Sequence, residues 1–212
     1  MKKRISILCL LTVFSVGFLS ANVKMNLELG PVYTYFGSRT SSGSGHTSWT
    51  THTGGLNVLF GVEFVKNFGA YVTANFAFGK DYWYKTSSPR SYTGFLNDAT
   101  LTYAIDSQFG FFYVFHPAKN FDLRLGAGLG IGGSGYNKPL SKSQANIGGG
   151  VDLNISYMFT KMIGIYGGVS DTLYAPVYTE TQISSTQSIK DTDVSGKIAN
   201  SLNIKAGIRL VF

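Results

Sequence analysis

The sequence predicts an all-β fold: a transmembrane antiparallel up-and-down β-barrel of eight strands. Three observations support this prediction. Apolar and polar residues alternate in eight segments, as strands with two different faces require. Only 14% of the residues are charged, whereas a soluble domain averages about 25%. After residue 21, no apolar run is long enough to form a membrane-spanning helix.

The first 21 residues are typical of a cleaved secretory signal peptide. A basic start at Lys2–Arg4 precedes an apolar stretch, Ile5–Leu19, which ends in small residues before a cleavage site. We therefore expect residues 1–21 to be removed on export and residues 22–212 to form one barrel domain. An uncleaved membrane anchor is the alternative, but the apolar stretch is short for one.

Charge and cysteine content exclude two classes of function. Without the signal, 15 Lys and Arg remain against 11 Asp and Glu, which gives a net charge of +4. The remaining chain has no basic run, so we expect no nucleic-acid partner. The one cysteine, Cys9, lies within the signal, so we expect neither disulfide nor thiol chemistry in the mature chain.

Each predicted strand has an apolar face and a face of small or polar residues. The segments are 23–36, 55–64, 68–79, 100–115, 121–132, 146–159, 163–173 and 202–212. The clearest is 121–132, where an apolar series from Phe121 to Ile131 alternates with Asp122, Arg124 and four glycines. This two-residue period indicates strands with one buried face.

The connections between these segments are of two kinds. Three are tight turns, near residues 66–67, 117–120 and 160–161. Four are long and rich in Ser, Thr and Gly: residues 37–53, 80–98, 133–144 and 175–200. Outer-membrane barrels have short periplasmic turns and long extracellular loops, and an even strand number brings both termini to the periplasmic side.

The apolar face is predicted to point outward, toward lipid. The polar face consists mostly of Gly, Asn, Thr and Ser, which suit a narrow lumen better than a water-exposed surface. Apolar-face aromatics cluster beside the tight turns, where a membrane interface favours them; they are Phe64, Phe68, Tyr113, Phe115, Phe121, Tyr157, Phe159 and Phe212. A soluble barrel with an apolar interior is the alternative.

The mature chain resembles the small outer-membrane barrels of the OmpA, OmpX and OmpW group. The most specific element is the C-terminal segment, in which Ile208 and Leu210 alternate with polar residues and lead to a terminal Phe212. This ending is similar to the signal that the barrel-assembly machinery recognises. The resemblance implies an integral outer-membrane protein whose partners are outer-membrane lipids and that machinery.

Charged residues recur on the face predicted to point inward. They are Glu28, Glu63, Asp106, Asp122, Arg124, Asp152, Lys205 and Arg209. Because the first and last strands must pair, Glu28 is expected near Lys205 or Arg209. Isolated charges are costly in a narrow lumen, so we predict a paired network that plugs the barrel. The alternative is a proton- or ligand-gated conduit.

The predicted extracellular loops combine basic and aromatic residues, with eight Lys or Arg against five Asp or Glu. The candidates for surface contact are Trp49, Tyr82, Trp83, Tyr84, Arg90 and Tyr136. Such loops suit contact with a glycan, a lipid headgroup or a host or surface protein. The plainer alternative is that they only extend the membrane interface.

We predict no catalytic, metal or cofactor site. His46 and Ser48 are weakly similar to the His and Ser pairing of lipid A deacylases, but the sequence places no acidic partner beside them. His46 and His52 also lack a third metal ligand in their loop.

The function predicted from sequence is a non-enzymatic outer-membrane protein that supports membrane integrity and surface interaction or adhesion. The main alternative is a narrow channel or carrier for small solutes, hydrophobic ones included. The inward glycines Gly126, Gly128, Gly130 and Gly132 favour that alternative, since missing side chains leave space in the upper lumen. A lipid A-modifying enzyme is a more distant alternative.

Overall fold

A computed structural model describes residues 23–42, 45–86, 93–95, 101–137, 141–182, 184 and 187–212. The predicted signal peptide, residues 1–21, lies outside this part of the chain. Among the described residues, no helix is long and apolar enough to cross a membrane.

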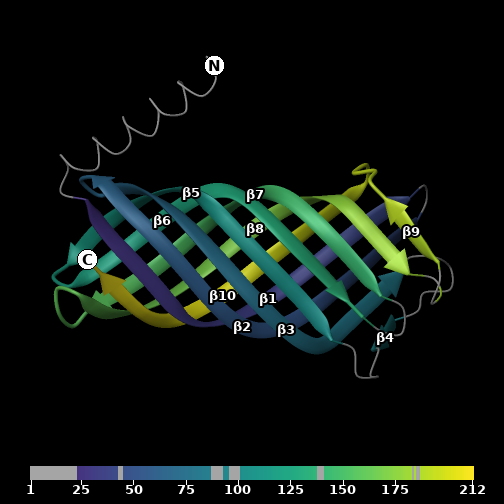
Figure 1. Cartoon of the computed structure of the whole chain (residues 1–212), viewed down its shortest axis with the longest axis horizontal. Coiled ribbons are helices and arrows are strands. Elements are labelled where there is room, and N and C mark those ends of the chain that lie inside the picture. The colour runs from purple at the N-terminus through teal and green to yellow at the C-terminus, as the bar shows by residue number, and fades with distance from the viewer. Residues whose placement is uncertain are drawn as a thin grey trace, which may run out of the picture.

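Eight long strands of the described chain close into an antiparallel barrel, which confirms the predicted fold (Figure 1). These strands are β1 (Lys24–Ser42), β2 (Gly45–Val65), β3 (Phe68–Thr86), β5 (Thr102–Ala118), β6 (Phe121–Tyr136), β7 (Lys142–Met158), β8 (Ile163–Gln182) and β10 (Lys197–Val211). Two short strands extend the sheet at one end of the barrel: β4 (Thr93–Phe95) pairs with β3, and β9 (Ser188–Asp191) pairs with β8.

The last long strand closes the barrel. β10 pairs with β8 along one edge and with β1 along the other, where Glu28 lies opposite Arg209. At the end of this ladder the Met25 N–H donates to the Phe212 carbonyl at 3.1 Å. The start of β1 and the C-terminus therefore lie together on the side of the tight turns (Figure 1).

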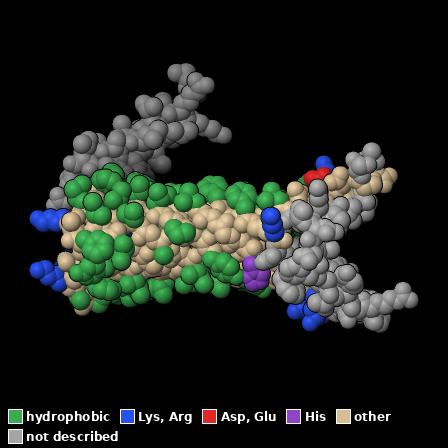
Figure 2. All heavy atoms as spheres, turned by 90° about the horizontal axis from the view of Figure 1, so that it is seen from below, with side chains coloured by type: hydrophobic (Ala, Val, Ile, Leu, Met, Phe, Trp, Pro, Cys, Tyr) green, Lys and Arg blue, Asp and Glu red, His purple; other side chains and the backbone are tan. Residues whose placement is uncertain are grey.

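The alternation of residues assigns one face of each strand to the outer wall. Leu29 and Ile204 are 47% and 52% exposed, whereas their inward neighbours Glu28 and Lys205 are 0% and 2% exposed. Figure 2 shows hydrophobic side chains spread over the outer wall. A wall of this kind is suited to lipid, and the polar residues fill the interior.

Three tight connections at one end fix the register of the hairpins. Asn67 and Asn120 adopt φ values of 66° and 65°, which asparagine tolerates better than most residues. In the third connection, the Thr160 hydroxyl accepts hydrogen bonds from the N–H groups of Met162 and Ile163 at 3.2 and 3.0 Å. These side-chain bonds replace ladder partners where the chain reverses.

Aromatic rings contact one another on the outer wall beside these turns. The ring centroids of Phe64 and Phe68 are 5.6 Å apart, and those of Phe121 and Tyr157 are 5.5 Å apart. Aromatic rings at this height are typical of the girdle that marks a membrane interface.

The strands extend further than the sequence predicted. The segment expected to be a loop at 37–53 is instead a continuation of β1 and β2, which stay paired up to Ser42 and Gly45. The segments 133–144 and 175–200 are likewise largely strand, and Pro117, expected in a turn, lies in β5. The physical reason is that inward side chains of these extensions, among them Ser38 and Trp49, are buried, so continued pairing removes them from water.

Candidate functional site: the lumen and its mouth

An ion pair crosses the full width of the lumen. Arg124 of β6 binds Glu28 of β1 through two bonds, Nη1–Oε1 at 2.9 Å and Nη2–Oε2 at 2.8 Å. Three strands separate β1 from β6 in either direction around the barrel, so the two residues project from opposite walls. Both side chains are at most 1% exposed. A bidentate pair is the strongest geometry that a guanidinium and a carboxylate can form.

Asp152 extends this ion pair toward β10. Its Oδ1 lies 3.4 Å from Arg124 Nη2, and its Oδ2 accepts from the Lys205 ammonium. Asn154, two residues along β7 on the same face, also donates to Asp152. The carboxylate is thus surrounded by donors, as a buried charge requires.

Arg209 extends the same cluster toward the turn side. Its Nη2 lies 3.3 Å from Asp122 Oδ2, its Nε lies 3.9 Å from Glu28 Oε1, and it donates to the Ser156 hydroxyl. Asp122 also contacts His116 Nδ1 at 2.7 Å, at the rim of the barrel. We call the six charged residues Glu28, Asp122, Asp152, Arg124, Lys205 and Arg209 the lumen cluster. It holds three acids and three bases, so its formal charge is balanced.

The other two predicted lumen charges lie apart from this cluster. Glu63 is half-buried at the rim, where its Oε1 accepts from the Asn67 N–H at 3.1 Å. Asp106 lies higher and is buried; it accepts from the Tyr174 hydroxyl at 2.8 Å and from Asn203 Nδ2 at 2.9 Å. Asn203 also projects from the wall opposite Asp106, so this bond is a second crossing of the lumen.

Uncharged inward residues that the sequence reasoning did not select also fill the lower lumen. The Tyr166 hydroxyl donates to Asn57 Oδ1 at 2.8 Å, and Asn57 Nδ2 donates to Asn75 Oδ1 at 2.6 Å. Beside them lies a small apolar group, which consists of Leu59, Tyr71, Phe112 and Val114. The sequence does contain a signal for these residues. Each of them occupies a position on the polar face of its strand, and that face points inward.

The glycine ladder of β6 does not leave the space that the sequence suggested. A Cβ on Gly126 would lie 2.9 Å from the Tyr71 ring, and one on Gly130 would lie 3.1 Å from the Tyr174 ring. A Cβ on Gly132 would likewise come within 3.2 Å of Tyr174. The missing side chains therefore make room for tyrosines from β3 and β8, and the rings occupy the space.

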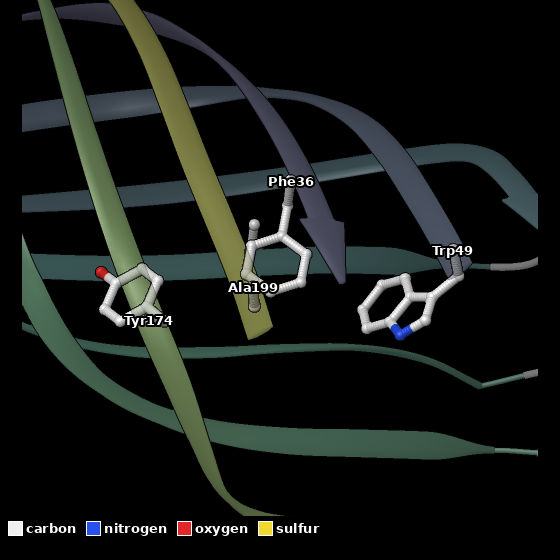
Figure 3. Close-up of a cluster of buried hydrophobic side chains, with 5 residues drawn as sticks. Phe36, Trp49, Tyr174 and Ala199 are labelled. Atoms are coloured by element: carbon white, nitrogen blue, oxygen red, sulfur yellow. The ribbon is translucent and has the colours of Figure 1, made fainter. Parts of the chain in front are cut away.

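Above Asp106, a cluster of buried aromatic side chains lies inside the barrel (Figure 3). Phe36 and Trp49 are each 2% exposed, and their ring centroids lie 5.2 Å apart. Tyr136 packs against Trp49 with centroids 6.3 Å apart. We call this group the aromatic plug; it consists of Phe36, Trp49, Ala104, Tyr136, Tyr174 and Ala199.

A cavity of about 490 Å³, which we call the mouth pocket, opens beyond the plug and is lined mainly by residues with polar side chains. Its lining residues are Thr40, Gly45, His46, Thr47, Lys142, Thr179, Thr181, Ile189, Asp191 and Lys197. The Lys142 ammonium lies 5.6 Å from the Trp49 ring centroid, and Lys197 Nζ lies 2.7 Å from Asp191 Oδ2. Lys142 is the first residue of β7, at the loop end of the barrel; burial, and secondly the charge of Lys197, lowers its pKa below that of a free lysine.

The predicted loop contacts divide into two groups. Trp49 was expected on an extracellular loop, but it is buried in the aromatic plug, and Tyr136 packs beside it. Their strands continue past the predicted loop boundary, so the alternation turns both side chains inward. Arg90 and the side chains of Tyr82, Trp83 and Tyr84 lie outside the described residues.

His46 and Ser48, the pair with weak similarity to deacylases, line separate cavities. His46 lines the mouth pocket, whereas Ser48 lines a groove with Tyr35 and Arg39. Within the described chain, no group of three or more His, Cys, Asp or Glu is placed to hold a metal ion. On β10, Ile208 and the adjoining Phe212 are 55% and 62% exposed, and Leu210 follows the same outward phase.

A family model matches residues 18–212, which is nearly the whole chain; its description is "Domain of unknown function (DUF2715)". The chain belongs to the DUF2715 family. No curated protein matches the sequence.

Solved structures of outer-membrane proteins share the fold. The chain is similar to the outer membrane protein OprG of Pseudomonas aeruginosa, with a TM-score of 0.61, 10% identity, and coverage of 91% of this chain and 97% of that one. Neisserial surface protein A gives a TM-score of 0.51 at 14% identity, with 88% and 96% covered. A major outer membrane protein of Thermus thermophilus gives 0.52 at 12% identity, with 85% and 99% covered. This DUF2715 member therefore has the fold of a small outer-membrane β-barrel.

Proposed function

We propose that the chain is a closed, non-enzymatic outer-membrane barrel that acts through surface interaction and contributes to membrane integrity. The observation that carries this proposal is the series of contacts that cross the lumen at successive heights. Arg124 bridges to Glu28, Asn203 to Asp106, and Ser38 to Gln144 at 3.1 Å. A solute path would have to break buried polar contacts at each level and then pass the aromatic plug.

The length of the strands supports a role at the loop end. β2 has 21 residues and β8 has 20, whereas about 9–11 tilted residues cross the hydrocarbon layer. Roughly half of each strand therefore projects beyond the bilayer and holds the mouth away from the membrane. A rigid, projecting rim is suited to contact with a partner outside the cell.

Export and assembly complete the proposal. The signal peptide at residues 1–21 directs the chain across the inner membrane and is cleaved. The outward apolar residues Ile208 and Leu210 of β10, together with the adjoining Phe212, then serve as the recognition signal for the barrel-assembly machinery. In the membrane, the apolar outer wall contacts lipid directly, which supports a contribution to membrane integrity.

Single-channel conductance tests the closed lumen. The mature protein, residues 22–212, is refolded, checked for a heat-modifiable shift in gel mobility, and inserted in a planar bilayer at two pH values. We expect a silent membrane, because the lumen cluster and the aromatic plug leave no continuous hydrated path. Discrete, reproducible openings from the folded barrel would overturn the proposal and favour the channel or carrier alternative.

A further inference from the structure

The mouth pocket has the size and lining of a small-molecule site. Its volume of about 490 Å³ lies within the range of roughly 300–1,000 Å³ that ligand pockets occupy. Four threonines from three different strands line it: Thr40, Thr47, Thr179 and Thr181. A threonine hydroxyl can both donate and accept, so these four can bind a ligand that carries several hydroxyl groups.

The pocket also holds more positive than negative charge. Lys142 and Lys197 line it together with one carboxylate, Asp191, which is paired with Lys197. Among the described residues, no carboxylate lies within ion-pair distance of Lys142, whose ammonium lies over the Trp49 ring. A half-buried ammonium without a carboxylate gains a charge-assisted hydrogen bond when an anion approaches it.

The arrangement also directs the excess charge toward the cavity. The aromatic plug lies between Lys142 and the lumen cluster, and the Lys142 ammonium, which lies over Trp49, lines the pocket. Lys197 is 7% exposed and approaches Lys142 from β10, and the two cations repel each other. An oxyanion between them would relieve this repulsion and form charge-assisted hydrogen bonds with both.

We propose that the mouth pocket binds a hexose-sized sugar that carries a phosphate or sulfate group. Lys142 and Lys197 hold the oxyanion, and the threonine hydroxyls bind the sugar hydroxyls. This inference deepens the proposed surface interaction, on which it rests, by naming the class of ligand taken at the projecting rim. The ligand can be a free sugar or the end of an acidic polysaccharide, since both present the same group.

The fluorescence of Trp49 can report ligand binding at this site. The chain has two tryptophans, Trp49 and Trp83, so a Trp83→Phe protein emits from the residue beneath Lys142 alone. This protein is refolded in uncharged detergent and titrated at constant ionic strength with glucose 6-phosphate, glucose 6-sulfate, glucose and inorganic phosphate. Saturable changes in emission are expected with the two anionic sugars at concentrations where glucose and inorganic phosphate produce none.

Variants separate the pocket from general surface charge. Lys142→Gln should weaken the binding of glucose 6-phosphate at least tenfold, and Lys142→Arg should largely restore it. The matched control is Lys190→Gln, which removes an exposed lysine of β9 that does not line the pocket. Equal loss in both Gln variants would mean non-specific attraction and would overturn the proposal. If Lys142→Gln fails to fold, Thr179→Val tests the hydroxyl contacts instead, with the same tenfold expectation.

Two further arms distinguish the remaining outcomes. Binding of inorganic phosphate as tight as that of glucose 6-phosphate would overturn the sugar assignment. Sulfated dextran that competes with glucose 6-phosphate supports a polysaccharide end as the source, whereas binding of the monosaccharide alone supports a free sugar. Conductance of the same preparation is measured in parallel: a silent barrel that binds no sugar overturns this inference and leaves the proposed closed barrel in place.

Discussion

The lower lumen and the mouth pocket use similar residues to opposite effect. In the lumen cluster, three acids and three bases are joined by a chain of ion pairs, and every member is at most 8% exposed. In the mouth pocket, the one lining carboxylate, Asp191, is paired with Lys197, and Lys142 has no carboxylate within ion-pair distance among the described residues. Paired charges in the lumen cluster hold opposite strands of the barrel together. An unpaired positive charge beside a cavity is instead placed to bind an anionic ligand from solution.

The surroundings of the two regions explain the difference. The lumen cluster is buried deep inside the barrel, where an unpaired charge has no access to bulk water and is expensive. The mouth pocket lies in the projecting part of the strands, where solvent reaches it and an incomplete pair is tolerated. The fold thus permits excess charge only at the end where a ligand can arrive.

The largest expected effect is the loss of the Arg124–Glu28 crossing. Arg124→Met removes the guanidinium and leaves Glu28 and Asp152 with fewer compensating charges in a buried site. Breaking one partner of a buried pair costs about 3–5 kcal/mol, so the free energy of unfolding should fall by that order. Equilibrium urea unfolding in phospholipid vesicles measures it.

Two controls test whether the cost comes from unpaired charge. The double variant Glu28→Leu with Arg124→Met removes both partners and should recover part of the loss, because no carboxylate then remains opposite β6. Lys190→Met, at an exposed position of β9, should leave stability unchanged. If Arg124→Met unfolds at the wild-type urea concentration, the crossing ion pair is not what holds the lower lumen.

A smaller effect is expected where the glycine ladder meets the tyrosines. Gly130→Ala would place a methyl group 3.1 Å from the Tyr174 ring and closer still to the Thr172 methyl. Overpacking of this kind costs about 1–3 kcal/mol, read from the same urea curves. Gly149→Ala is the matched control, since its nearest neighbour would be a backbone oxygen 3.7 Å away. Equal stability of the two variants would show that the upper lumen still contains free space.

Neighbouring strands made part of the site predictable from sequence. Side chains alternate between the two faces of a strand, so the polarity of Glu28, Asp152 and Lys205 was enough to predict that they point inward. The Glu28–Arg209 proximity followed from barrel closure, because the first and last strands must pair. The partner of Arg124 could not be found in this way, since its guanidinium reaches across the lumen to a strand that it never pairs with.

The length of the strands was the second feature that could not be predicted from the sequence. In water, both a loop and a projecting strand contain Ser, Thr and Gly, so the run from residue 37 to 53 fits either structure. Whether the segment forms a loop or a strand depends on the contacts of its inward side chains. Trp49 packs against Phe36 and against Tyr136 inside the barrel. These contacts depend on how three strands are aligned in space, which the local periodicity of one segment does not reveal.

The smallest expected effect concerns pH at the mouth pocket. Burial and the charge of Lys197 lower the pKa of Lys142, so the cation is lost at a lower pH than in a free lysine. A bound oxyanion favours the charged form and raises that pKa again. The affinity for glucose 6-phosphate, measured through Trp49 emission, should therefore fall as pH rises through the lowered pKa of Lys142. Lys142→Arg keeps its charge at every accessible pH and should flatten this fall, while Lys190→Gln should leave it intact. A wild-type affinity that stays constant until free lysines titrate would remove Lys142 from the anion contact and reduce the contrast with the lumen cluster.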